Sequence, residues 1–189
     1  LFKLVTRWIT TFSLPFAILI LLFPKKIMLI FGSEYLPGYP ILMLLVTAAF
    51  IQAVFGIGGT TLNMTGFPKI NLMNTFIACG FNIGLNFYLI PTMGGKGAAI
   101  ATLITLSFIA FIRIIQNWKL LQLTPWSPKL IKPILAGIMA FGAGYYIKVL
   151  IMPFHTIITL MSGGFIIVIV FFTTLWLLGL DEDDSGLLA

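Results

Sequence analysis

Long apolar stretches alternate along the whole chain with short segments that carry the charges, prolines and paired glycines. A helix needs about 20 mostly apolar residues to cross the hydrocarbon core of a bilayer. Cutting the chain at its charged and turn-forming residues leaves six such stretches, at about residues 8–31, 39–65, 68–91, 97–121, 129–150 and 154–180. Pro24, Lys25 and Lys26 are expected to bend the first of them. The pattern predicts an all-α, polytopic membrane helical bundle of six transmembrane helices.

The composition agrees with this pattern. Hydrophobic residues make up 60% of the chain and charged residues 8%, and the mean hydropathy is +1.12. Soluble domains carry about 25% charged residues, because water covers their outer surface. The outer solvent of this chain is therefore predicted to be the lipid bilayer. The simplest organisation is one membrane domain over residues 1–180, followed by an acidic cytoplasmic tail at residues 181–189.

The positive charges predict an orientation. The 11 Lys and Arg residues are scattered one or two at a time, so they form no basic patch of the kind that binds nucleic acid. Seven fall on one side of the predicted membrane and four on the other, and the seven are Lys3, Arg7, Lys69, Arg113, Lys119, Lys129 and Lys132. Because cytoplasmic loops carry an excess of Lys and Arg, we expect both ends of this segment on the cytoplasmic side of the cell membrane.

Side chains for catalysis or metal binding are scarce. Four of the five acidic residues lie in the tail, the fifth is Glu34, and His155 and Cys79 are each the single residue of their type. The glycine pairs in "GIGG" and "GGKG" match no nucleotide-binding pattern. We therefore predict no enzyme activity, no catalytic residue, no metal site and no cofactor.

The uncharged stretch "NLMNTFIACGFNIGLNFYLIP", residues 71–91, contains four asparagines. At about 100° per residue, Asn71, Asn74, Asn82 and Asn86 share one helix face about 120° wide. Gly80 and Gly84 lie on the opposite side as a GxxxG pair, where a neighbouring helix can approach closely. The pattern predicts an interior helix with protein or water on two sides.

Two interpretations of the asparagine face stay open. Each amide can hydrogen-bond a neighbouring helix, as polar side chains in membrane bundles commonly do. Alternatively, the face lines a hydrated cavity through which a polar cargo passes. The two are compatible for different members of the group.

Arg113 raises a similar question in the stretch at residues 97–121. It lies near the cytoplasmic end, where a long side chain can extend to the interface. The alternative is a cation at the mouth of a cavity that meets an anionic head group. On the same helix, Gly97, Ala101 and Thr105 are spaced four residues apart and predict a packing seam.

The order of these pieces resembles a known family. The segments are "FGSEYLPGYPILMLL" (31–45), "TGFPKINLMNTFIACGFNIGLNFYLIPTMGGKGAAIATLIT" (65–105) and "LGLDEDDSGLL" (178–188). Together they resemble the C-terminal part of polysaccharide biosynthesis proteins, the Wzx-type oligosaccharide flippases of the multidrug/oligosaccharidyl-lipid/polysaccharide exporter superfamily. The most specific part is the order G-x-P-K, three asparagines, L-I-P and G-A-A-I-A-T.

The resemblance implies a function and a missing partner. Such flippases have two similar bundles that rock around a central cavity and carry lipid-linked oligosaccharide, of the polyprenyl diphosphate type, across the membrane. The chain then corresponds to one lobe of a two-lobed fold, and the N-terminal bundle lies outside it, which accounts for a first residue of Leu1. The expected cargo-binding residues are Asn74, Asn82, Asn86 and Arg113, with Arg7 and Lys69 as weaker candidates.

Two other functions are compatible with the sequence. A drug or metabolite exporter of the same superfamily shares the fold. A membrane scaffold or enzyme subunit that transports nothing is a further alternative from a different class.

Overall fold

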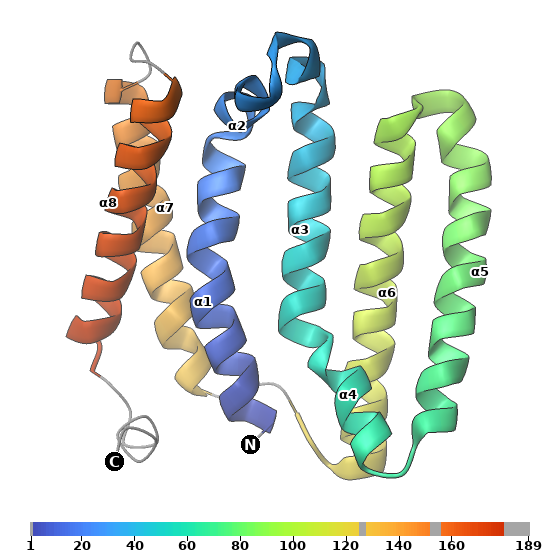
Figure 1. Cartoon of the computed structure of the whole chain (residues 1–189). Coiled ribbons are helices and arrows are strands. Elements are labelled where there is room, and N and C mark those ends of the chain that lie inside the picture. Colours follow the sequence, from blue (N-terminus) through green and yellow to red (C-terminus); the bar gives the residue numbers. More distant parts are fainter. Residues whose placement is uncertain (1, 125–127, 152–155, 180–189) are drawn as a thin grey trace.

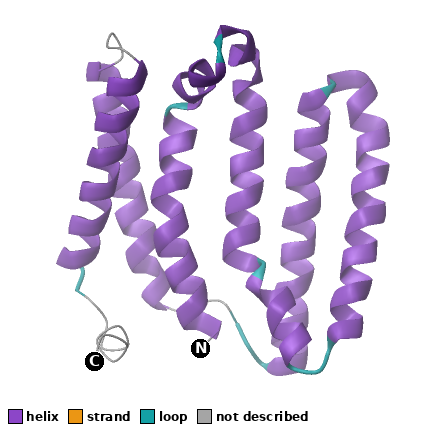
Figure 2. Cartoon of the chain, viewed as in Figure 1, coloured by secondary structure: helices purple, strands orange, loops and turns teal. Residues whose placement is uncertain are grey.

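The computed structural model describes residues 2–124, 128–151 and 156–179, and within these ranges every regular element is a helix (Figures 1 and 2). The long helices are α1 (Phe2–Leu22), α3 (Tyr39–Phe55), α5 (Pro68–Met93), α6 (Gly95–Leu121), α7 (Ile131–Ile151) and α8 (Thr156–Leu177). The short ones are α2 (Pro24–Phe31), η1 (Ser33–Gly38), α4 (Ile57–Met64) and η2 (Pro128–Leu130). Within the described ranges, six helical segments are long and apolar enough to cross a membrane, so the predicted all-α polytopic bundle is confirmed.

Two predicted spans are broken where the sequence has a helix breaker. The first is interrupted at Phe23, directly before Pro24, because the residue before a proline is disfavoured in the helical region. The second is divided at Gly56 into α3 and α4. The predicted bend at Pro24 is therefore a break between two helices. Residues 154, 155 and 180, at the predicted ends of the sixth span, and the acidic tail lie outside the described residues.

The long helices stand side by side in a row that runs from α7 and α8 through α1, α3 and α6 to α5 (Figure 1). The start of α1, the short helix α4, the start of α5 and the ends of α6 and α8 all lie at the lower end of the row in Figure 1. We call this the α4 end of the bundle. The charge count predicts that this end of the bundle is cytoplasmic. The beginning of α1 and the end of α8 both lie at this end, on the same side of the predicted membrane.

A buried apolar cluster joins α1 to α7 and α8. Its members are Ile18, Leu22, Phe23, Ala136, Ala140, Ile167 and Phe171. Glycine allows the close approach here: a Cβ at Gly163 would lie 2.8 Å from the ring of Phe23. Helices in lipid associate mainly through such tight van der Waals contact, because lipid offers them little hydrophobic driving force.

Helices α5 and α6 form a second tight unit. The predicted seam is confirmed, since Gly97, Ala101 and Thr105 are all buried. A Cβ at Gly97 would overlap the backbone carbonyl of Leu89 on α5. Only glycine therefore fits where the two helices diverge from the turn at Gly94.

Helix α5 lies at the edge of the row (Figure 1), so the prediction of an interior helix with protein or water on two sides is wrong for the described part of the chain. It contacts α6 and α4, and no described atom lies within 4 Å of a Cβ placed at Gly80 or Gly84. The predicted neighbour on the GxxxG face is therefore wrong for the described part of the chain. The close approach comes instead from the small residues of α6, which bring the opposite, asparagine-bearing face of α5 against that helix.

Candidate functional site

Two asparagines of α5, Asn74 and Asn82, form hydrogen bonds with side chains of α6. Asn74 and Gln116 exchange two bonds: Asn74 Nδ2 donates to Gln116 Oε1 at 2.6 Å, and Gln116 Nε2 donates to Asn74 Oδ1 at 2.9 Å. Two turns further, Asn82 Nδ2 donates to Thr105 Oγ1 at 3.2 Å, and Asn86 Nδ2 donates to Asn82 Oδ1 at 2.8 Å. The shared face predicted from the spacing is thus present.

These contacts match the interpretation in which the amides bond a neighbouring helix. It holds most fully for Asn74, which is 2% exposed and paired at both its donor and its acceptor. Asn82 and Asn86 are half-buried, and Asn86 Oδ1 is a buried acceptor with no partner in the described structure. Cargo binding by this pair stays a prediction, and Asn86 retains the hydrogen-bonding capacity for it.

A double-mutant cycle tests the structural role of the Asn74 pair. We expect Asn74→Ala and Gln116→Ala each to destabilise the protein, with a coupling free energy of about 1 kcal/mol, because each substitution leaves the other amide unpaired in the membrane. The coupling is measured from reversible unfolding in mixed micelles. Pairing Asn74→Ala with Thr92→Ala, an exposed position on α5, is the control and should give none. A coupling of zero for Asn74 with Gln116 would contradict the reciprocal bonding.

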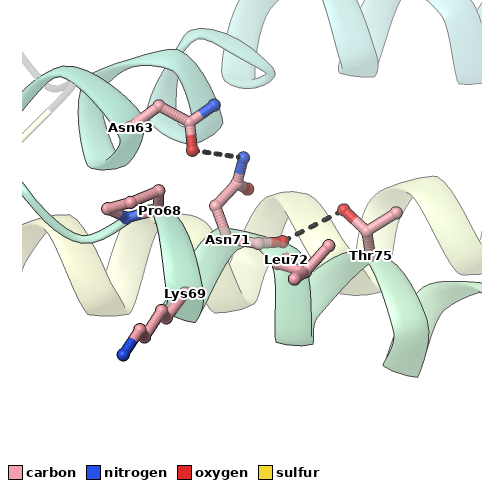
Figure 3. A pocket seen from close by; sticks show the side chains of 6 residues that line it. All are labelled: Asn63, Pro68, Lys69, Asn71, Leu72 and Thr75. Carbon is pink, nitrogen blue, oxygen red and sulfur yellow. Dashed lines mark hydrogen bonds between the residues drawn. The ribbon is translucent and has the colours of Figure 1, made fainter.

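A second polar group surrounds the glycine-rich start of α4. Asn117 Nδ2 donates to the carbonyl of Gly58 at 3.0 Å and to the carbonyl of Arg113 at 2.8 Å, which ties α6 to α4. Asn71 Nδ2 donates to Asn63 Oδ1 at 3.0 Å and ties α5 to α4 (Figure 3). Three helices therefore meet at Gly58 and Gly59, both buried.

Arg113 lies inside this meeting point. A Cβ at Gly59 would be 3.0 Å from Arg113 Cζ, 3.1 Å from Arg113 Nε and 3.0 Å from Asn71 Oδ1. The guanidinium and the asparagine oxygen thus converge on the face of α4 that lacks a side chain. Arg113 is half-buried, and its Nε has no hydrogen-bond partner in the described structure.

A cavity of about 380 Å³ lies beside this point, between α4 and the first turns of α5. It is lined by Asn63, Pro68, Lys69, Asn71, Leu72 and Thr75. Asn63 and Asn71 point toward one another, while the Lys69 side chain extends away from them (Figure 3). Lys69 is one of the weaker candidates from the sequence, and none of Asn74, Asn82, Asn86 and Arg113 lines this cavity. Arg7, the other weaker candidate, is buried on α1, at 7% exposed.

The structure adds residues that the sequence did not single out. Asn117 hydrogen-bonds the backbone of α4, and side chains of α6 pack against Gly58 and Gly59. The sequence signals were present as "GIGG" and as an asparagine one turn after Arg113, but nothing in the sequence shows that these segments touch. Among the described residues, no three His, Cys, Asp or Glu side chains are grouped as a metal site would require.

Comparison with known proteins finds a similarity to a membrane protein. The chain is 37% identical over 142 residues, 72% of its length, to the uncharacterized membrane protein MJ1068 of Methanocaldococcus jannaschii. The chain spans 27% of the length of that relative. No family model and no solved structure matches the chain. The similarity and the six apolar helices together show a membrane protein with several membrane-spanning helices.

Proposed function

We propose that this chain is the C-terminal six-helix lobe of a transporter that flips lipid-linked oligosaccharide across the cytoplasmic membrane by alternating access. The observation that carries the proposal is the row of polar side chains between α5 and α6, which runs from Asn74 to Asn86. It lies on the edge helix of the row of helices. Polar groups at membrane depth usually face the interior of a bundle or a water-filled path.

The chemistry of the row suits a sugar. Amide and hydroxyl groups both donate and accept hydrogen bonds, as the hydroxyl groups of an oligosaccharide do. The amide and hydroxyl groups are also uncharged, so binding of a neutral glycan leaves no unpaired charge in the membrane. Asn86 Oδ1 is buried and has no hydrogen-bond partner in the described structure. In this proposal Asn82 and Asn86 meet the glycan, and Arg113 meets the diphosphate of the carrier lipid.

Alternating access needs a second lobe, and the relative has room for one. The matched segment is 27% of the relative's length, so most of that membrane protein lies outside the matched part. Secondary transporters are commonly built from two similar bundles around a site near the midplane. We therefore expect the second bundle, in the complete protein, to complete the cargo cavity.

Reconstitution tests the proposed reaction. The complete protein is placed in vesicles that contain a polyprenyl diphosphate-linked oligosaccharide, and a membrane-impermeant glycosidase reports the fraction of glycan that reaches the outer leaflet. We expect that fraction to rise faster with protein than in empty vesicles. Efflux of a small cationic dye without any movement of the glycan would instead support a drug exporter of the same fold. Movement of neither cargo would favour a membrane scaffold.

A further inference from the structure

Two short helices, α2 and η1, connect α1 to α3 at the end of the bundle opposite α4 (Figure 1). We call residues 24–38 the α2–η1 segment. Helix α1 has 21 residues and is therefore about 30 Å long, which already matches the hydrocarbon thickness of a bilayer. The next candidate span, from Ser33 to Met64, has 32 residues and is longer than one crossing requires. Neither crossing needs the α2–η1 segment, which thus lies at the edge of the membrane.

One side of the α2–η1 segment packs on the bundle. Helix α2 contacts α3 and α8 as well as η1. Pro24 is buried, and a Cβ at Gly38 would lie 3.9 Å from Met28 Cε. Lys25 Nζ lies 4.9 Å from the ring centre of Tyr39, the first residue of α3. These contacts hold the segment against the ends of the long helices.

The other side of the α2–η1 segment exposes large apolar side chains. Ile30, Phe31 and Tyr35 are 60%, 70% and 59% exposed. On the long helices, exposed apolar side chains of this kind meet the lipid tails. The α2–η1 segment lies beyond the length of helix that the lipid tails cover, so water would surround these three side chains if nothing else did. Burial of apolar surface is favourable, and an exposed apolar patch marks a contact surface.

We propose that the α2–η1 segment is an interfacial anchor, which lies in the phospholipid head-group layer at the end of the bundle opposite α4. Ile30, Phe31 and Tyr35 contact lipid there, and Lys25 lies near the lipid phosphates. The charge count predicts that this layer belongs to the outer leaflet. The inference goes beyond the proposed function, and it holds whether or not the protein moves a glycan.

The aromatic residues mark this level of the protein independently. Tryptophan and tyrosine are enriched where a membrane meets water, because their rings suit the head-group layer. All five tyrosines lie toward the end opposite α4, and they are Tyr35, Tyr39, Tyr88, Tyr145 and Tyr146. The tryptophans that the structure describes lie toward the α4 end, and they are Trp8, Trp118 and Trp176. The two groups thus mark two interfaces, and the α2–η1 segment shares the tyrosine level.

The charges of the α2–η1 segment favour lipid over another protein as the contact. Lys25 and Lys26 against Glu34 give two positive charges and one negative, a net charge of +1. Lys25 and Glu34 are exposed beside the apolar side chains. Charged residues are depleted at the core of protein–protein interfaces. A head-group layer accommodates both kinds of side chain, because lysine can reach phosphate and water while the apolar groups meet the acyl chains.

Spin labels on the complete protein test the proposal, in vesicles of equal parts phosphatidylcholine and phosphatidylglycerol. Cys79→Ser, with the same change at any further cysteine, provides the background. Labels at Ile30→Cys and at Phe31→Cys report collisions with oxygen, which concentrates in lipid, and with a water-soluble nickel chelate. We expect both labels to favour oxygen, at a depth of about 5–10 Å below the lipid phosphates. Glu34→Cys, an exposed position of the same segment, is the matched control and should favour the nickel chelate. Phe76→Cys, exposed on α5, gives the reference for the acyl chains.

Three results would overturn the proposal. Preference for the nickel chelate at both Ile30→Cys and Phe31→Cys would place the α2–η1 segment in water. Few collisions with either reagent at these positions would show that protein covers them, either another part of the complete chain or a second copy. Preference for oxygen at Glu34→Cys equal to that at Phe31→Cys would show that the apolar side chains are not selectively immersed. The two apolar label positions are independent, so the Phe31→Cys label decides the matter if Ile30→Cys fails to fold.

Discussion

Replacing Gly97 by leucine should separate α5 from α6 and destabilise the protein by about 3 kcal/mol or more. The reason is steric: a Cβ at this position overlaps the backbone carbonyl of Leu89, and a backbone cannot move aside as a side chain can. The same displacement would break the bond between Asn82 and Thr105. The free energy of unfolding is measured in mixed micelles, with helix content followed by circular dichroism.

Gly142→Leu is the matched control for this change. Gly142 also lies within a predicted span, on α7, but a Cβ there meets nothing within 4 Å. We expect a change of less than about 0.5 kcal/mol, as for substitutions away from packed contacts. Equal stability of the Gly97→Leu and Gly142→Leu variants would show that α5 and α6 do not approach as closely as described.

The helices themselves were largely predictable from the sequence. Bilayer thickness fixes the length of a span, and charges, prolines and glycines mark its ends, so six spans were found with ends displaced by a few residues. The largest displacement is at the first span, which runs from Phe2 to Leu22 rather than from about Trp8 to Phe31. It begins earlier because Lys3 and Arg7 lie within the first turns of α1. A helix can carry such charges near its end when the long side chains reach the interface.

The arrangement of the helices was less predictable, because it depends on which small residues form the contacts. The GxxxG pair at Gly80 and Gly84 and the seam at Gly97 and Ala101 both predict close approach. Only the second is occupied by another helix of the described chain. A sequence pattern on one helix identifies the face that is suited to close contact, but it does not identify the helix that makes the contact.

The candidate site was predictable in part for the same reason. Helical spacing placed Asn74, Asn82 and Asn86 on one face, and the structure shows that this face meets α6. The group of Asn71, Gly59 and Arg113 joins α4, α5 and α6, and Arg113 is distant in sequence from the other two residues. No spacing rule connects such residues, because their contact depends on the tertiary packing of α4.

Replacing Asn82 and Asn86 together by leucine should lower the rate of oligosaccharide translocation by about a hundredfold. Each amide removed from a hydrogen-bonded path costs about 1–3 kcal/mol, because its partner in the cargo or the protein is left unpaired. Thermal unfolding in detergent checks that the variant protein remains folded. Phe76→Leu with Phe87→Leu, two exposed positions on the outer face of α5, is the matched control and should retain normal translocation.

The most direct measurement is the initial rate at which lipid-linked oligosaccharide reaches the outer leaflet of vesicles that contain the complete protein. We predict rapid movement with the original protein and with the Phe76→Leu, Phe87→Leu control, and a rate near that of empty vesicles with the folded Asn82→Leu, Asn86→Leu variant. Undiminished translocation by that folded variant would contradict the proposal that these two amides carry the glycan through the membrane.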